Sequence, residues 1–230
     1  DKSLVWGIGI GLPGPVEESG EIACAVNLHW GRKNIEKELG DMTGLKVKAG
    51  NDANVAALGE MWKGGGQGAK NLILVTLGTG VGGGIIINEK IVTGAHGAGG
   101  EIGHAPVNPE ESIPCNCGNK GCLEQYASAT GIARLARKAM DNTNKSSSLR
   151  YCPSVNAKDV FDAYKEGDEL AAEVVEEFSE YMGRALAAFT CVTDPDVIVL
   201  GGGVSKAGEP LIDCVEKYYK NYAFTACKET

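Results

Sequence analysis

The spacing of apolar residues along the chain predicts strands and helices in alternation. Apolar side chains recur at helical spacing over residues 53–63 and 168–193, which predicts a helix in each segment. In the second segment the spacing places five large residues on one stripe: Leu170, Val174, Phe178, Met182 and Leu186. Further helices are expected over 34–44, 123–140 (as two helices), 157–165 and 210–221.

Short runs rich in Val, Ile and Leu predict the strands. These runs are residues 4–12, 47–49, 71–77, 84–88 and 197–200, and a hairpin turn is expected at Asn88-Glu89. Glycine-rich turns are expected over 78–84 and 94–103, and the polar run 141–154 is the expected mobile surface loop. Hairpins mixed with strand–helix units indicate an α/β fold with a mixed sheet and flanking helices.

Composition and charge narrow the class of protein. The 230 residues can bury a sizeable core, and 33 glycines without a collagen-like period indicate tight turns and close backbone approaches. The net charge of −8 argues against a nucleic-acid surface on this segment, although loop amides and a metal ion can still hold an anionic nucleotide. No apolar run approaches the ~20 residues of a membrane span, and the first residues do not resemble a signal peptide. A cytoplasmic protein is expected.

Three of the eight cysteines form a cluster with an upstream histidine. The segment HAPVNPEESIPCNCGNKGC carries His104, Cys115, Cys117 and Cys122. Three thiolates and one imidazole make a closed tetrahedral shell that suits structural zinc and leaves no position for an activated water. Free thiols, or one disulfide with a spare thiol, are the alternative. We expect the other five cysteines to be buried or unreactive, and His29 and His96 to be ordinary structural residues.

Two glycine-rich segments can bring backbone N–H groups to an anion. LGTGVGGG (residues 77–84) joins two predicted strands, and the Thr79 hydroxyl can donate to a phosphate oxygen. VIVLGGGVS (residues 197–205) reads as a strand, a triple glycine and a helix. The first lacks the G-K-[ST] ending of a nucleotide P-loop. Each alone also fits a turn whose glycines serve only packing, but together they favour phosphate binding.

Several carboxylates are candidates for chemistry. Asn51-Asp52 falls where a strand ends and a helix begins, and helix capping is the interpretation that the local sequence favours. The alternative is a carboxylate that accepts the proton of an alcohol attacking phosphorus. Glu101 lies three residues before His104, and Glu124 lies two after Cys122. A metal-binding loop would therefore carry both carboxylates beside an imidazole, which favours function over solvated surface charge.

These motifs occur in the same order in the ROK family of the actin–hexokinase superfamily, and the chain resembles that family over nearly its whole length. The matching segments are GLPGPV, VNLHW, GNDANVAALGEMWKGGG, VTLGTGVGGG, GAGGEIGH, CNCGNKGCLE and VLGGGVS. The glucokinase branch is the most similar. The resemblance implies an actin–hexokinase-like (ribonuclease H-like) sugar kinase fold with a zinc-stapled loop. It implies a partial small domain over 1–52 and a large domain over 53–230.

The resemblance also implies a role for each matching residue. Asp52 matches the catalytic base that takes the proton from the sugar 6-hydroxyl. The sugar-binding set comprises Gly14, Asn51, Asp52, Glu101, His104 and Glu124. The zinc ligands are His104, Cys115, Cys117 and Cys122. The phosphate loop contains Gly78, Thr79 and Gly80, and the adenosine loop contains Gly201 and Gly202.

The implied reaction transfers the γ-phosphoryl group of ATP, with Mg²⁺, to O6 of glucose in a homodimeric enzyme. A kinase for fructose, N-acetylglucosamine or N-acetylmannosamine is an alternative, as is the sugar-sensing domain of a ROK-type transcriptional repressor. A zinc-stapled domain without catalysis is disfavoured by the joint occurrence of the loops. The D-x-G-G-T segment of the family has no match here. A truncated chain, impaired as a kinase on its own, is therefore expected.

Overall fold

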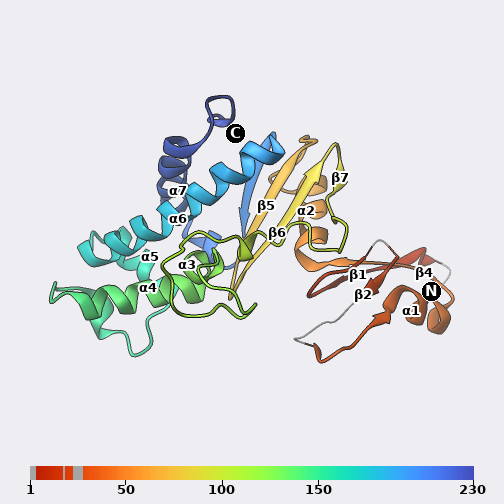
Figure 1. Ribbon diagram of the computed structural model, residues 1–230, viewed down its shortest axis with the longest axis horizontal. Helices are drawn as coiled ribbons and strands as arrows, with labels where there is room; N and C mark the ends of the chain where they lie inside the picture. Colours follow the sequence, from red (N-terminus) through yellow and green to blue (C-terminus); the bar gives the residue numbers. More distant parts are fainter. Residues whose placement is uncertain (1–3, 18, 23–27) are drawn as a thin grey trace. The chain divides into compact units, whose positions relative to one another are not determined.

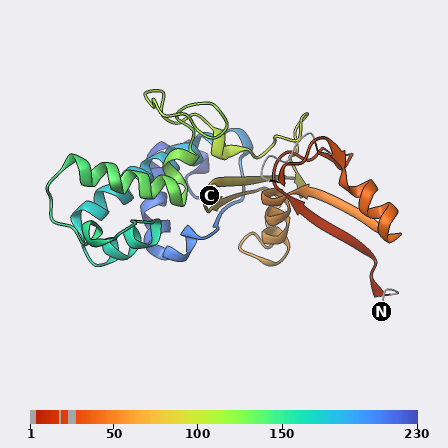
Figure 2. The same cartoon turned by 90° about the horizontal axis from the view of Figure 1, so that it is seen from below.

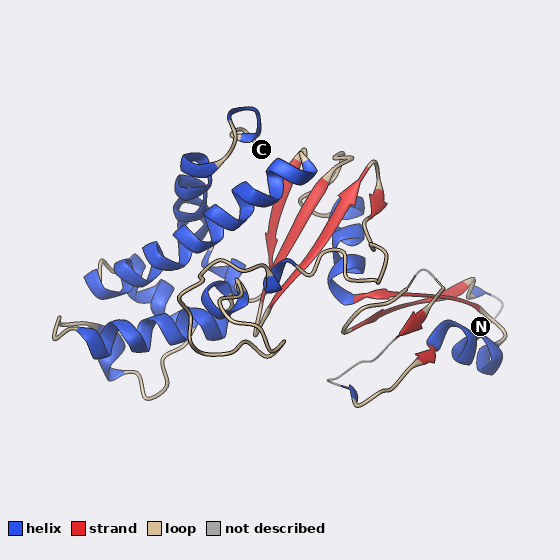
Figure 3. Cartoon of the chain, viewed as in Figure 1, coloured by secondary structure: helices blue, strands red, loops and turns tan. Residues whose placement is uncertain are grey.

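The structure, a computed structural model, describes residues 4–17, 19–22 and 28–230. Cys24 and part of the VNLHW motif lie outside these ranges. Helices and strands mix along the described chain, as the sequence predicts (Figure 3). Cα packing divides the chain into two compact units, Asp1–Leu74 with Gly83–Glu101, and Val75–Gly82 with Ile102–Thr230. The domain boundary expected between residues 52 and 53 stays a prediction.

Two strand pairs and two helices of the described chain come from the N-terminal segment of the first unit, residues 1–74. Strand β1 (Gly7–Leu12) pairs in parallel with β4 (Lys46–Asn51), and in this pair Leu12 lies opposite Asn51. The other elements are the antiparallel pair β2 (Glu21–Ile22) and β3 (Lys33–Asn34), α1 (Ile35–Thr43) and α2 (Asp52–Lys63). One buried hydrophobic cluster is formed by Leu12, Val16, Ile22 and Ile35. Because α2 follows β4 without a loop, Asn51 and Asp52 lie at the carboxyl end of a strand.

A four-stranded sheet has the order β7-β6-β5-β8 (Figure 1). Its strands are β5 (Leu72–Leu77), β6 (Val81–Ile87), β7 (Lys90–Ile91) and β8 (Val197–Gly201). Strands β6 and β7 form an antiparallel hairpin, and Asn88 and Glu89 both have positive φ (52° and 64°), which confirms the predicted turn. Parallel and antiparallel pairs both occur, as expected for a mixed α/β fold.

The glycine-rich turn predicted over 78–84 is shorter than expected. Strand β6 already begins at Val81, so only residues 78–80 form the turn. Gly84 serves packing instead. A Cβ on Gly84 would lie 2.6 Å from the Cβ of Ala57 and 2.8 Å from the carbonyl oxygen of Ala53, both on α2. Glycine at this position lets α2 pack closely against β6.

Helices dominate the second unit. They are α3 (Glu124–Ala127), α4 (Ala129–Asn142), α5 (Ala157–Lys165), α6 (Glu169–Thr193) and α7 (Glu209–Tyr222). Helices α4 to α7 lie together in both views (Figures 1 and 2). The predicted stripe on α6 is confirmed, since its five residues are at most 2% exposed. Short 3₁₀ turns cover Ile102–His104, Ser148–Tyr151, Val204–Ala207 and Thr225–Cys227.

The polar run 141–154, predicted as a mobile surface loop, is tied to the start of α6 by a hydrogen bond, and its mobility stays a prediction. Helix α4 extends to Asn142, and Leu149 within the following 3₁₀ turn is only 1% exposed. The Ser147 hydroxyl donates to Asp168, at 2.8 Å, and the same carboxylate caps α6. A contact 21 residues away along the chain therefore fixes a segment whose local composition indicates a loop.

Two further features concern the described part of the chain. None of its helices is long and apolar enough to cross a membrane. The seven cysteines that it contains are free thiols.

Candidate functional site

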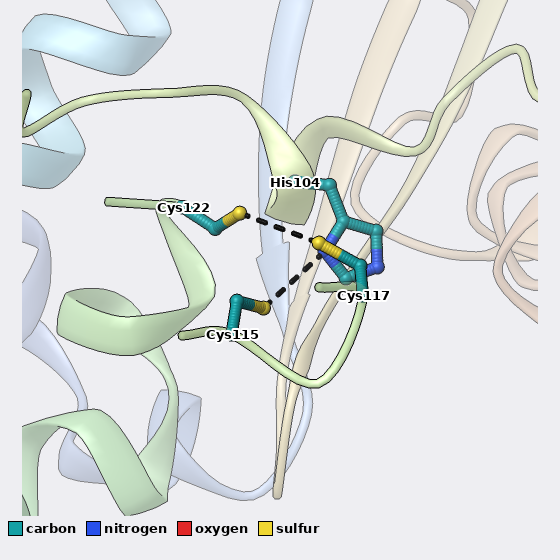
Figure 4. Close-up of side chains that lie close together, drawn as sticks. All are labelled: His104, Cys115, Cys117 and Cys122. Carbon is teal, nitrogen blue, oxygen red and sulfur yellow. Dashed lines mark hydrogen bonds between the residues drawn. The ribbon is translucent and has the colours of Figure 1, made fainter. Parts of the chain in front are cut away.

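Four potential metal ligands gather in one loop of the second unit (Figure 4). The ligand atoms of His104, Cys115, Cys117 and Cys122 all lie within 4.8 Å of one another. The sulfurs of Cys117 and Cys122 are 3.6 Å apart, and the sulfur of Cys115 is 3.8 Å from Nδ1 of His104. Tetrahedral zinc with Zn–S bonds of about 2.3 Å holds its sulfurs about 3.8 Å apart. The separations therefore fit a tetrahedral metal site.

Backbone hydrogen bonds fold the chain around this cluster. The N–H of Cys115 donates to the carbonyl of Asn119 at 2.6 Å and closes a tight turn. The N–H of Leu123 donates to the carbonyl of Ala105 at 2.9 Å. The second bond joins the segment that follows the histidine to the segment that follows the last cysteine, so ligands far apart in sequence converge without a regular element.

The pKa values of the cysteines in this cluster depend on burial and on the neighbouring thiols. Cys115 and Cys122 are buried, whereas Cys117 is exposed. Burial, together with the neighbouring thiols, raises the pKa of Cys122 to about 12, and burial also raises the pKa of Cys115. A bound cation reverses this trend because it stabilises the thiolate. Three sulfurs and one imidazole nitrogen form a donor set that structural zinc uses, so the residues present fit that ion.

Glu124 connects the metal-ligand cluster with the turn between β5 and β6. Its Oε2 accepts the N–H of Val81 at 3.0 Å, and its Oε1 lies 3.9 Å from the sulfur of Cys115. A Cβ on Gly80 would lie 2.2 Å from Oε2, so only glycine fits there while the carboxylate keeps its place. The structure thus joins a predicted sugar-binding carboxylate directly to the predicted phosphate loop, residues 78–80.

The two predicted nucleotide loops lie side by side in the second unit. Gly201 ends β8, and Gly202 follows with a φ of 87°. A Cβ on Gly202 would lie 2.6 Å from the carbonyl oxygen of Leu77, the last residue of β5. Leu77 directly precedes Gly78. Glycine is therefore required at position 202 both for its backbone conformation and for this close approach.

A hollow of about 320 Å³ opens next to these loops. Its lining comes from the start of α4, from the length of α5 and from the segment after β8, and includes Ala129, Phe161, Lys165, Gly203 and Lys206. The N–H of Ala129 donates to the carbonyl of Gly78 at 2.8 Å, so the hollow adjoins the phosphate loop. Its lysines favour an anionic occupant in a chain that is acidic overall.

In the first unit, Asn51 is both a helix cap and a tether to the predicted sugar-pocket turn. Its Oδ1 accepts the N–H groups of Ala53 and Asn54 at 3.0 and 3.1 Å, which confirms the capping interpretation. Its Nδ2 donates to the carbonyl of Gly14 at 3.2 Å. Asp52 occupies the first position of α2, and its exposed carboxylate accepts the N–H of Ala53 at 2.8 Å. Because Asn51 provides the side-chain cap of α2, Asp52 is not needed for that role, and its predicted part in catalysis stays a prediction.

Glu101 ends the glycine-rich loop of the first unit, and its side chain is exposed. Gly100 before it has a φ of 91°, and a Cβ there would lie 3.3 Å from Oδ1 of Asn54. That oxygen is buried and has no hydrogen-bond partner among the described residues. The loop therefore packs against α2. Glu101 and His104 belong to different units, so the predicted proximity of Glu101 to the metal ligands stays a prediction.

A partly buried ion pair that the sequence did not predict supports the metal-binding loop. Oε2 of Glu111 accepts bonds from the Tyr126 hydroxyl at 2.7 Å and from Arg134 at 2.8 Å. The Glu111 side chain is 9% exposed, and the Arg134 guanidinium lies 4.9 Å from the centre of the Tyr126 ring. Arg134 also donates to the carbonyl of Gln125, whose side chain bonds the N–H of Cys122 at 3.1 Å. No local spacing links Glu111 to partners 15 and 23 residues away.

Stability should depend on pH through Glu111. Burial alone would raise the pKa of this carboxyl, but bonds from Tyr126, the Ile113 N–H and Arg134 lower it from 4.5 to about 2. Ionised Glu111 therefore stabilises the fold above about pH 4.5, and this contribution disappears as the pH falls towards 2. We expect Glu111→Gln to lower the free energy of unfolding by about 3 kcal/mol at pH 7.

Urea unfolding at a series of pH values checks this expectation. Glu110→Gln is the matched control, because Glu110 is an exposed neighbour of the same charge. The difference between the two variants should shrink steadily below pH 4.5. A difference that is the same at pH 3 and pH 7 would contradict the role given to the Glu111 charge.

The chain matches the ROK family over residues 2–230, and it belongs to that family. It is 48% identical over 226 residues to the glucokinase of Halalkalibacterium halodurans, covering 96% of this chain and 68% of that protein. It is also 32% identical to the xylose repressor of Caldicellulosiruptor bescii, covering 96% of this chain and 56% of that protein. The family thus includes relatives named for two different functions.

A solved structure agrees with the fold. The ROK glucokinase of Streptomyces griseus, crystallised with glucose and AMPPNP, superposes with a TM-score of 0.81 at 35% identity. The match covers 95% of this chain and 72% of that one. The α/β fold with a mixed sheet is therefore that of ROK sugar kinases.

Proposed function

We propose that this chain is the main part of an ATP-dependent glucokinase that transfers the γ-phosphoryl group of ATP to O6 of glucose. The observation that carries the proposal is the bond from the Val81 N–H to Glu124. It joins a carboxylate suited to sugar hydroxyls to a glycine turn suited to phosphate, within one unit. The relatives named glucokinases support both the kinase class and glucose as substrate.

The roles divide between the two units. Asp52 is the base that accepts the proton of the attacking sugar hydroxyl. Sugar hydroxyls bind the carboxylates and polar groups of Gly14, Asn51, Glu101, His104 and Glu124. The nucleotide binds Gly78, Thr79 and Gly80 through its phosphates and Gly201 and Gly202 through its adenosine. The lysine-lined hollow beside residues 203–207 supports this placement. Mg²⁺ accompanies ATP, and the active form is a homodimer.

Zinc is the metal proposed for His104, Cys115, Cys117 and Cys122. With all four positions taken by protein ligands, zinc supplies structure and no activated water. His104 would hold the ion through Nδ1, which lies 3.8 Å from the sulfur of Cys115, and its Nε2 would remain for a sugar hydroxyl. Cys122 would be held in the same way, and because it lies two residues before Glu124, a bound metal would help to position that carboxylate.

Steady-state phosphorylation of a sugar panel tests the proposal. The protein, in its native full-length form, is assayed with Mg·ATP and glucose, fructose, N-acetylglucosamine or N-acetylmannosamine. We expect glucose to have the highest kcat/KM and to give glucose 6-phosphate. A higher kcat/KM for a different sugar would support the kinase class but contradict glucose as the substrate.

The same assay separates an enzyme from a sugar sensor. The xylose repressor among the relatives makes a sensor the second candidate. The presence of Asp52 and of both glycine loops favours the enzyme, because a sensor needs no base and no phosphate loop. Calorimetric sugar binding without phosphorylation of any sugar in the panel would replace the kinase proposal with the sensor.

A further inference from the structure

The phosphate loop is held from both sides by one short stretch of chain. The carbonyl of Gly78 accepts the N–H of Ala129 at 2.8 Å, and the carbonyl of Thr79 accepts the Thr130 hydroxyl at 2.7 Å. On the other side, the N–H of Val81 donates to Glu124. All three contacts come from residues 124–130, where α3 meets α4.

This corner is itself rigid. Ser128 is fully buried and caps α4, its Oγ accepting the N–H of Gly131 at 2.9 Å. The same Oγ lies 2.9 Å from Oγ1 of Thr130, so the two hydroxyls form one chain of hydrogen bonds that ends on the Thr79 carbonyl. Because the cap fixes Ser128 and Ser128 orients Thr130, the Thr130 hydroxyl has one well-defined direction.

The Thr130 hydroxyl makes a long-range hydrogen bond that an exposed threonine on a helix does not need. Thr130 is exposed on α4, where a hydroxyl can be satisfied by water. Its hydroxyl instead reaches the carbonyl of a residue 51 positions earlier in the chain. That carbonyl belongs to the peptide joining Thr79 to Gly80, so fixing it fixes the orientation of the next N–H group. N–H orientation is what a glycine turn offers to phosphate.

We propose that Thr130 is a positioning residue for the nucleotide, whose hydroxyl holds the phosphate loop in its binding shape. This inference rests on the proposed kinase function and adds to it a residue outside the sugar, zinc and nucleotide sets. Thr130 does not touch the reacting atoms; it acts through the Thr79 carbonyl. Its loss should weaken nucleotide binding and leave sugar binding intact.

Thr130→Val removes the hydroxyl and keeps the branched shape. We expect KM for ATP to rise about tenfold, kcat to fall, and KM for glucose to stay within about twofold. Calorimetric titration of the native full-length protein with Mg·AMPPNP should show the same loss of affinity. Thr130→Ser, which keeps the hydroxyl, should restore most of the affinity.

The matched control is Thr193→Val, which also removes a hydroxyl–carbonyl bond, that of Thr193 to Phe189 at 2.8 Å. It lies at the end of α6 and should leave the affinity for Mg·AMPPNP unchanged. Thr130→Val with wild-type affinity for Mg·AMPPNP would overturn the positioning role alone. Equal losses for glucose and nucleotide that Thr130→Ser does not restore would indicate a general packing defect and would also overturn it. Wild-type protein that binds glucose but no nucleotide would overturn the kinase proposal together with this one.

Discussion

Asp52→Asn should lower kcat for sugar phosphorylation by at least a few hundredfold while the sugar still binds. Asparagine has the same size as aspartate, and its side-chain oxygen can still accept the N–H of Ala53 that Asp52 accepts. The variant cannot take the proton of the sugar hydroxyl at neutral pH. General-base catalysis typically contributes about 10²–10⁴-fold, which sets the size of the expected loss.

The contacts around Asp52 indicate that this substitution affects catalysis without disturbing the fold. Asn51 supplies the helix cap, so the fold does not depend on the Asp52 charge for that function. Losing one carboxylate from the first turn of α2 costs only about 0.5 kcal/mol through the helix dipole. Steady-state kinetics and calorimetric sugar binding measure the two expected effects separately.

Asp41→Asn is the control for this experiment. Asp41 is an exposed aspartate on α1 that pairs with Lys37, one helical turn away. The control should retain wild-type kcat. A loss of less than tenfold in Asp52→Asn would remove Asp52 from the role of base.

The fold was largely predictable where the packing obeys a simple period. On α6 the apolar residues recur every four positions, and all five predicted residues are buried because one face of the helix meets the core. Glycine was harder to interpret. A glycine run is typical of a turn, but at Gly84 it marks the close approach of α2, which local sequence does not reveal.

The parts of the candidate site that could be predicted are those whose residues lie close together in the sequence. The four metal ligands fall within 19 residues in a spacing typical of zinc, and the structure brings their ligand atoms together. The ion pair of Glu111 with Arg134 and the bond of Thr130 to Thr79 join residues 23 and 51 positions apart. Neither has a periodic signal, because such contacts depend on how the chain folds back rather than on neighbouring residues.

Cys122→Ser should remove bound metal and lower the midpoint of thermal unfolding by about 10 °C. The expectation follows from the closed shell, in which losing one thiolate leaves three ligands and sharply reduces affinity. Each kcal/mol of lost stability lowers the midpoint by roughly 2–4 °C in a chain of this size, and a structural zinc contributes several kcal/mol. Zinc analysis of the purified protein and differential scanning calorimetry check the two parts.

The matched control is Cys191→Ser, because Cys191 is an exposed free thiol outside the cluster. It should keep one zinc per chain and the wild-type midpoint.

Cys122→Ser should also weaken nucleotide binding, since Glu124, two residues on, holds the Val81 N–H of the phosphate loop. Wild-type protein that carries well under one zinc per chain after purification with zinc present would contradict the metal assignment. If the metal is lost but nucleotide binding persists, the ion stabilises the loop without positioning Glu124, and the link between the metal and the phosphate loop is refuted.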